Sequence, residues 1–256
     1  MVLGGSNVDY GVAPGLRVSE TPTKATPSSG GVYTYTMTNV IPAAATGSFT
    51  ISMEAANTVT LLPGTTQQVS ATDSAIPVEY YFSVDSSPTQ ARRVVVSLSK
   101  CGGCHQNLAF VHGGTRGNTT ECVICHNPTL ADGTSKQSVS FATQIHSIHR
   151  GSNLTNPYVL GTTNYQEVLF PGDLRDCSQC HVNSSEQLPL TGFRLPVNDP
   201  KAYIPVMGAE TAACLACHDT KGTAAHASAN TTSIGESCDT CHGSQGAYSV
   251  SVVHAH

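Results

Sequence analysis

The stretch CGGCHQNLAFVHGGTRGNTTECVICHN, residues 101–127, decides how this chain folds, because it holds two copies of one short motif. In each copy two cysteines stand two residues apart and a histidine follows at once. The motif occurs five times and uses every cysteine of the chain: Cys101, Cys104 and His105; Cys122, Cys125 and His126; Cys177, Cys180 and His181; Cys214, Cys217 and His218; Cys238, Cys241 and His242.

The pattern C-x-x-C-H is the attachment signature of a c-type haem. Its two thiols bond to the vinyl groups of one porphyrin, and the adjacent imidazole becomes the proximal ligand of the iron. A lone C-x-x-C is more typical of a zinc half-site or a redox pair, and many cysteines in an exported protein are more typical of disulfides. Neither alternative explains a histidine after every pair. The sequence therefore predicts five covalently bound c-type haems.

The distribution of cysteine and histidine divides the chain. Residues 1–100 contain neither, whereas all 10 cysteines and all 11 histidines lie between Cys101 and His256. We therefore expect two domains, residues 1–99 and residues 100–256. Only 6% of the residues are aromatic, so the porphyrins themselves are expected to supply much of the buried apolar surface of the second domain. That domain should consist of loops and short helices at the motifs, with almost no strand.

The histidines outside the motifs are candidates for the second axial position of each iron. His256 is a spare candidate. The five predicted distal ligands are His112, His146, His149, His226 and His254. His146 and His149 stand three residues apart in a predicted helix, residues 141–150, and should serve two different haems. Met207 offers a histidine–methionine alternative that the count of histidines does not require. Irons with two imidazoles have no open position, which favours electron transfer over catalysis.

The first 99 residues read as an all-β domain. Alternating apolar residues predict strands near 32–37, 49–53, 59–62, 78–84 and 92–98, with turn clusters between them. Strands at this spacing favour a small β-sandwich or split barrel. Residues 1–30, rich in proline, serine and glycine, are expected to be irregular or linker-like. Two roles are open for this domain as expectations: a structural cap or spacer, or a docking surface for a partner or a mineral.

Charge and hydropathy exclude other classes. With 12 Lys and Arg against 17 Asp and Glu, the chain has no basic footprint for nucleic acid. No apolar run is long enough for a transmembrane segment. No leader opens the chain, yet c-type haem attachment requires export, so we expect a processed or partial chain. Its expected location is the cell surface or the extracellular space, with the periplasm as the alternative.

Longer stretches around the motifs resemble a known family, the outer-surface multihaem c-type cytochromes of the OmcA/MtrC family. Residues 101–127 are similar to its first two haem sites, with His112 in an HGG ligand position. IHSIHRG at 145–151 resembles its double-histidine helix, and FPGDLRDCSQCHVN at 170–183 resembles its third site. The tail, with His226 after the fourth motif and His254 after the fifth, is similar again.

The resemblance implies alternating β and pentahaem domains, bis-histidine ligation throughout, and transfer of electrons to extracellular acceptors. These acceptors are ferric or manganese oxides, flavins and partner cytochromes. Members of the family often carry two domains of each kind, whereas this chain is expected to carry one of each. Its first domain also lacks the paired cysteines that some members have there.

Three functions compete. The leading hypothesis is an electron-transfer protein that is not a classical enzyme. A second is a repeating subunit of a cytochrome filament, in which copies of the chain bind head to tail and His256 ligates a neighbour's iron. A third is a multihaem oxyanion reductase, which needs a haem with an open site. The absence of a C-x-x-C-K motif argues against the third.

Overall fold

The structure is a computed structural model that describes residues 1–11, 16–110 and 112–255. The chain divides into two compact units. The first comprises Met1–Arg92 and Gly102–Cys125, and the second comprises Arg93–Cys101 and His126–His256. The segment that carries most of the first two haem motifs thus groups with the N-terminal strands. The expected division into domains at residues 99 and 100 stays a prediction.

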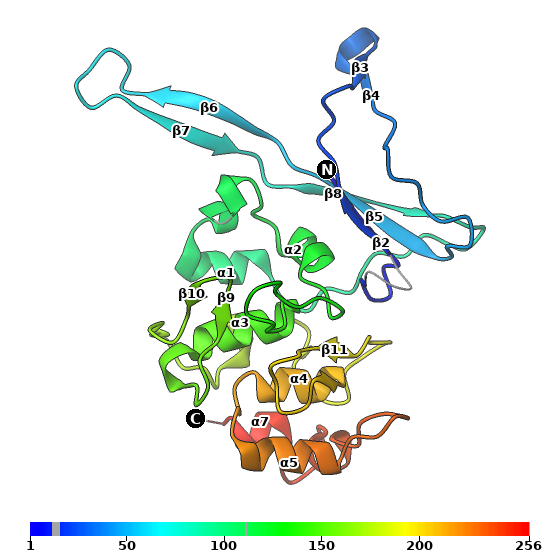
Figure 1. The fold of residues 1–256 in the computed structure, drawn as a ribbon, viewed down its shortest axis with the longest axis vertical. Coiled ribbons are helices and arrows are strands. Elements are labelled where there is room, and N and C mark those ends of the chain that lie inside the picture. Colours follow the sequence, from blue (N-terminus) through cyan, green and yellow to red (C-terminus); the bar gives the residue numbers. More distant parts are fainter. Residues whose placement is uncertain (12–15, 111, 256) are drawn as a thin grey trace. The chain divides into compact units, whose positions relative to one another are not determined.

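The first unit is built on a four-stranded antiparallel sheet in the order β2-β1-β5-β8 (Figure 1). Its strands are β1 (Val2–Gly5), β2 (Leu16–Ser19), β5 (Ser48–Met53) and β8 (Val78–Ser83). Phe49 and Phe82 lie opposite each other across β5 and β8, with ring centroids 6.4 Å apart. The predicted strands at 49–53 and 78–84 are confirmed by β5 and β8.

The expectation that residues 1–30 are irregular is wrong where β1 (Val2–Gly5), β2 (Leu16–Ser19) and the two residues of β3 (Thr26–Pro27) form strands. β1 is an inner strand of the sheet, and all four of its residues are buried. The alternation of apolar residues does not reveal this strand, because two of its four residues are glycines. Close packing explains why these positions are glycines. A Cβ atom at Gly4 would collide with Ile124, and one at Gly5 would collide with the ring of Phe49.

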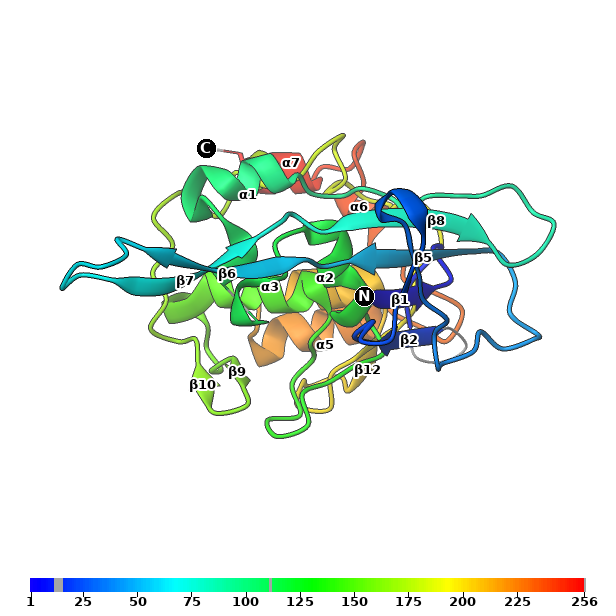
Figure 2. The ribbon, with the colours of Figure 1, turned by 90° about the horizontal axis from the view of Figure 1, so that it is seen from above.

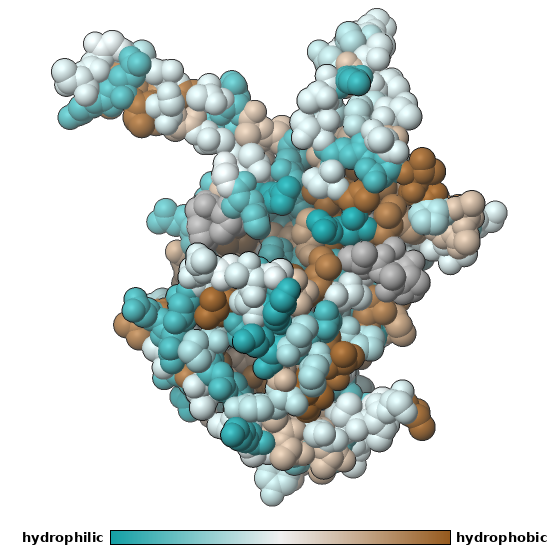
Figure 3. Space-filling view, in the orientation of Figure 1, coloured by the Kyte–Doolittle hydropathy of each residue, from teal (hydrophilic) through white to brown (hydrophobic). Residues whose placement is uncertain are grey.

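Two hairpins complete the first unit. The longer one joins β6 (Ala56–Leu61) to β7 (Val69–Ser74), and the shorter joins β3 (Thr26–Pro27) to β4 (Tyr33–Thr34) around the 3₁₀ turn η1 (Ser29–Gly31). Figure 2 shows β6 and β7 running side by side. Figure 3 shows a brown patch among white and teal side chains on this hairpin, where Leu61, Leu62 and Val69 are exposed. The strands thus form small sheets, and a sandwich or split barrel stays a prediction.

Two of the predicted strands differ from the structure. The strand predicted at 32–37 is reduced to the two residues of β4, and the one predicted at 92–98 is wrong. There Val96 makes only an isolated bridge with His181, and a helix begins at Leu98. The backbone carbonyl of Val95 accepts a hydrogen bond from Val182 N at 3.1 Å. The segment 92–98 is therefore hydrogen-bonded to the end of the third motif and does not join the sheet.

Helix α2 (Thr119–Cys125) anchors the second motif to the first unit. Its Ile124 is fully buried in a cluster with Val2 and Tyr10. The hydroxyl groups of Tyr10 and Thr50 are hydrogen-bonded at 2.7 Å. Burying an apolar side chain of this size contributes about 2 kcal/mol. The cysteines of this motif are thus held on a rigid support.

Loops and short helices make up the rest of the chain, as predicted. The helices are α1 (Leu98–His105), α3 (Phe141–Arg150), α4 (Ala209–Leu215), α5 (Lys221–Ala229), α6 (Asp239–His242) and α7 (Val250–Val253). The 3₁₀ turns are η2 (Leu108–Phe110), η3 (His112–Gly114), η4 (Gly151–Asn153) and η5 (Cys177–Gln179). Two ladders pair β9 (Val159–Leu160) with β10 (Thr163–Asn164) and β11 (Val197–Asn198) with β12 (Val206–Met207).

A cluster of buried apolar side chains in the second unit contains Val197, Met207 and Ala212. Met207 is 3% exposed there, so its thioether packs in this cluster. Among the described residues, no helix is both long and apolar enough to cross a bilayer.

Candidate haem sites

Three pairs of histidines face each other in the second unit. The ring centroids are 6.1 Å apart for His146 and His181, 6.1 Å for His218 and His254, and 6.3 Å for His226 and His242. Each pair joins a motif histidine to one of the predicted distal ligands. Two imidazoles that bind one metal ion from opposite sides, each at about 2 Å, have centroids about 6 Å apart. The residues therefore fit an iron between each pair.

Hydrogen bonds fix the tautomer of several of these rings. Nδ1 faces a backbone carbonyl oxygen in four histidines: Val139 O at 3.2 Å for His126, Ile145 O at 2.9 Å for His149, Tyr248 O at 2.8 Å for His242 and Val250 O at 2.9 Å for His254. A carbonyl oxygen only accepts, so Nδ1 carries the proton. The lone pair then sits on Nε2, which is the usual arrangement of a metal-ligating histidine.

His181 is oriented by a side chain. Its Nδ1 lies 3.0 Å from Ser185 Oγ, and that hydroxyl donates its own proton to Val95 O at 2.6 Å. The serine oxygen must therefore accept the Nδ1 proton. Sequence reasoning missed Ser185 and the carbonyl partners. Two of the carbonyl partners could have been found from their spacing, because Ile145 lies four residues before His149 on α3 and Val250 lies four residues before His254, the residue that caps α7.

Burial keeps several of these imidazoles neutral. It lowers the pKa of His146 to about 4, and the nearby His181 and His149 contribute to the shift. Burial also lowers the pKa values of His112, His181 and His218. A neutral imidazole is the form that binds a metal ion. The electrostatics of these sites therefore agree with their geometry.

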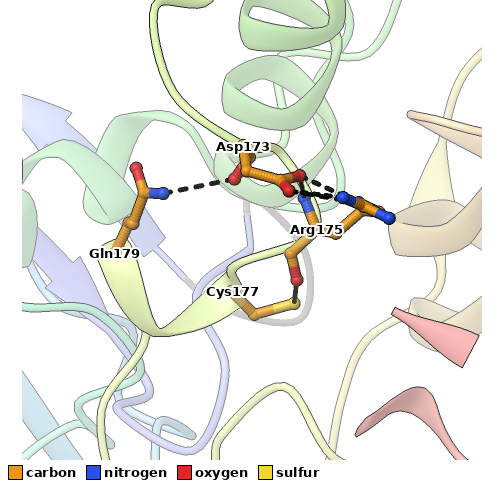
Figure 4. A network of polar contacts seen from close by, with 4 residues as sticks. All are labelled: Asp173, Arg175, Cys177 and Gln179. Atoms are coloured by element: carbon orange, nitrogen blue, oxygen red, sulfur yellow. Dashed lines mark hydrogen bonds and ion pairs between the residues drawn. The ribbon is translucent and has the colours of Figure 1, made fainter. Parts of the chain in front are cut away.

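A compact turn presents the cysteines of the third motif (Figure 4). The guanidinium of Arg175 binds the carboxylate of Asp173, with the shortest contact at 2.7 Å. Gln179 Nε2 donates to Asp173 O at 3.2 Å, and the Cys177 thiol donates to Arg175 O at 3.5 Å. None of the ten cysteines is paired in a disulfide in the part of the chain that the structure describes, as thioether attachment requires.

Neighbouring motifs approach one another. Lys100 Nζ donates to Ser178 O at 2.6 Å and to His181 O at 2.9 Å, which ties α1 to the third motif. A hydrogen bond from Cys101 lowers the pKa of Cys180 to about 7.

The fourth motif is close to both the third and the fifth. Burial raises the pKa of Cys217 to about 11 and that of Cys238 to about 12. The charges of Cys177 and Cys214, respectively, add to these shifts. Thiols of the third and fourth motifs, and of the fourth and fifth, therefore lie close enough for their charges to interact.

The other predicted ligands occupy separate places. His112 opens the turn η3 with a φ of 51°, ahead of Gly113 and Gly114, which also have positive φ. His149 packs edge-on against Phe170 with centroids 5.4 Å apart, and thus points to a different neighbour from His146. The role of His112 and His149 as distal ligands stays a prediction. His256 lies outside the described residues.

Comparisons with known proteins identify relatives of this chain. Residues 93–255 match the family described as "Outer membrane cytochrome MtrC/MtrF-like, domains II/IV". The chain is 28% identical over 106 residues to the multiheme cytochrome MtrC of Shewanella baltica (strain OS185), which covers 41% of this chain and 13% of that protein. The crystal structure of the outer membrane decaheme cytochrome OmcA superposes with a TM-score of 0.57 at 22% identity. That match covers 91% of this chain and 34% of the OmcA chain, so this chain spans about a third of that structure's length.

Proposed function

The chain belongs to the outer membrane cytochrome MtrC/MtrF-like family through residues 93–255, and on that premise we propose that it conducts electrons through five c-type haems toward acceptors outside the cell. The proposed acceptors are ferric or manganese oxides, flavins and partner cytochromes. The observation that carries this proposal is the set of three facing histidine pairs. The proposed location is the cell surface, after export.

Each proposed haem uses two thioether bonds and two imidazoles. The attaching thiols are the ten motif cysteines, and the proximal ligands are His105, His126, His181, His218 and His242. The facing rings support His146 as the distal ligand for His181, His254 for His218 and His226 for His242. His112 and His149 are the distal ligands proposed for the other two irons. When bound, the haems supply a reversible one-electron couple between ferric and ferrous iron.

The protein's own contribution is to fill and orient the axial positions. The carbonyl and serine partners make Nδ1 the protonated nitrogen of His181, His242 and His254, so the lone pair of each ring is on Nε2. Two imidazoles on each iron leave no position for a substrate, so electrons pass without bond making. This arrangement favours electron transfer over the oxyanion reductase.

The neighbouring motifs support an order for the path. Cys101 contacts Cys180, Cys177 influences Cys217, and Cys214 influences Cys238. These relations link the first motif to the third, the third to the fourth and the fourth to the fifth. We infer that electrons follow this order through these four motifs.

Mass spectrometry and spectroscopy of the exported holoprotein test the proposal. We expect a mass equal to the chain plus five haems, low-spin ferric signals in electron paramagnetic resonance (EPR), and no new absorbance band when carbon monoxide is added to the reduced protein. A smaller haem count would overturn the proposed stoichiometry. A high-spin haem that binds carbon monoxide would instead indicate an enzyme with an open site.

A further inference from the structure

Lys100 stands directly before the first haem motif, yet its side chain binds the third. Its ammonium group donates to Ser178 O at 2.6 Å and to His181 O at 2.9 Å. The backbone of the same segment joins the motif as well, because Ser97 N donates to Cys180 O at 3.1 Å. A lysine side chain otherwise samples many rotamers. The two carbonyl bonds therefore hold this positive charge at one place beside the motif.

Glu186 brings a negative charge to the same motif. Its carboxylate lies close enough to Cys177 and His181, the first and last residues of the motif, for its charge to act on both. Gln187 Nε2 donates to Glu186 Oε1 at 3.1 Å. Because this partner is an uncharged amide, it does not neutralise the carboxylate.

The charges of Lys100 and Glu186 are not cancelled by direct partners. In the part of the chain that the structure describes, neither residue forms an ion pair. The nearby pair Arg175–Asp173 differs, because its two opposite charges are in contact at 2.7 Å. The charged groups that act on His181 are Glu186 and Lys100, and all three residues belong to the second unit. Opposite charges thus act on one axial ligand.

Charges at this place change the equilibrium between oxidised and reduced iron. Ferric iron, the porphyrin ring and two neutral imidazoles together carry one net positive charge, and one added electron makes this centre neutral. A nearby cation repels the ferric form and thereby raises the reduction potential. A nearby anion attracts the ferric form and lowers the potential.

We propose that Lys100 and Glu186 set the reduction potential of the third haem in opposite directions, with Lys100 raising it and Glu186 lowering it. The inference rests on the proposed function, because it takes His181 and His146 as the axial ligands of that iron. The step concerned is the transfer of one electron from a neighbouring ferrous haem, which becomes ferric, to the third haem, which becomes ferrous. No bond forms or breaks. The two residues thus determine how readily the third haem accepts an electron.

A redox titration of the holoprotein, followed by EPR, tests this proposal. The low-spin signal that is lost in His146→Ala identifies the third haem. We expect Lys100→Gln to lower the midpoint potential of that signal and Glu186→Gln to raise it. Each change should alter the one-electron equilibrium constant roughly threefold to tenfold, and tenfold corresponds to about 59 mV. Lys100→Arg keeps the charge and should stay close to the wild type.

Salt separates the effect of charge from that of a lost structural bond. Lys100 is exposed and Glu186 is half-buried, so both charges are open to screening. The Debye length falls from about 10 Å at 0.1 M salt to about 3 Å at 1 M. The potential difference between Lys100→Gln and the wild type should therefore shrink at the higher salt concentration. A difference caused only by displacement of the motif would not shrink.

Two matched variants serve as controls. The Lys136 ammonium also binds a carbonyl oxygen, Gly133 O at 2.6 Å, but outside every haem motif. Lys136→Gln, and Glu167→Gln at an exposed position, should leave the potential of the third haem unchanged.

Two results would overturn the proposal in different ways. If all variants carry five low-spin haems and the third potential stays constant in Lys100→Gln and Glu186→Gln, or moves the same way in both, the proposal is wrong and the proposed function stands. If His146→Ala leaves every signal low-spin, the assignment of the third iron is wrong and this inference fails with it.

Discussion

The imidazole rings of His146 and His181 lie with their centroids 6.1 Å apart and their planes at 29° to each other. They come from segments 35 positions apart in the sequence, the helix α3 and the end of the third motif. We expect His146→Ala to remove the distal ligand of the third haem alone. That iron becomes high-spin and binds carbon monoxide when reduced, while the other haems keep their low-spin signals. EPR and carbon monoxide difference spectra measure this change.

Gln144→Ala, on the same helix, provides the control and should leave every haem low-spin. If His146→Ala leaves all signals low-spin as well, the assignment of His146 to the third iron is wrong. His226→Ala should give the corresponding change at the fifth haem, because His226 faces His242 at 6.3 Å.

Ser185→Ala tests the hydrogen bond that orients His181. The serine oxygen accepts the Nδ1 proton of His181 and thereby increases electron donation by the imidazole. Its loss should raise the reduction potential of the third haem by up to about 60 mV, equivalent to a tenfold change in a one-electron equilibrium constant. Spectroelectrochemical titration measures the potential. Ser184→Ala is the matched control, and a potential that stays constant or falls in Ser185→Ala contradicts the expectation.

The motifs and the helix at 141–150 could be predicted from the sequence because both depend on local spacing. The structure gives α3 the bounds Phe141–Arg150, which are the predicted ones. The facing of His226 with His242 and of His254 with His218 could not be predicted. It depends on how the chain returns to each motif, and His254 follows the fifth motif yet faces the histidine of the fourth.

The N-terminal strand was missed for a different reason. Periodicity arguments rely on side chains, and half of β1 is glycine. The glycines are required by close packing against Ile124 and Phe49, residues distant in the sequence. Such tertiary requirements leave no local pattern.

A buried ion pair stabilises the first unit. Arg92 and Asp9 are 2.9 Å apart, and their side chains are 12% and 0% exposed, respectively. Arg92 also lies over the Tyr10 ring at 4.8 Å. Because Asp9→Asn leaves the guanidinium buried without its carboxylate, we expect a loss of about 3–5 kcal/mol. Hydrogen exchange of the β1 and β5 amides, followed by mass spectrometry, measures the loss.

The exposed pair Arg175–Asp173, at 2.7 Å, offers the comparison. Asp173→Asn should cost much less than Asp9→Asn, since exposed ion pairs contribute little. Equal losses in the two variants would show that burial does not strengthen the Asp9 interaction.

The carboxyl group of Glu121 makes the stability of the first unit depend on pH. Glu121 is 1% exposed, and burial, followed by the charge of Glu54, raises its pKa from 4.5 to about 7. The folded chain therefore keeps this proton between pH 4.5 and 7, whereas the unfolded chain releases it.

The contribution of Glu121 to the free energy of unfolding should accordingly be highest below pH 4.5. It should fall as the pH rises from 4.5 to 7 and stay constant above pH 7. The fall is at most roughly 3 kcal/mol, at about 1.4 kcal/mol per unit of pKa shift. Glu121→Gln should abolish this slope, because an amide does not titrate. Glu167→Gln, at an exposed position, should keep the slope. Hydrogen exchange of the β1 amides across this pH range measures both variants, after correction for the intrinsic pH dependence of exchange. A slope that persists in Glu121→Gln assigns the effect to another group.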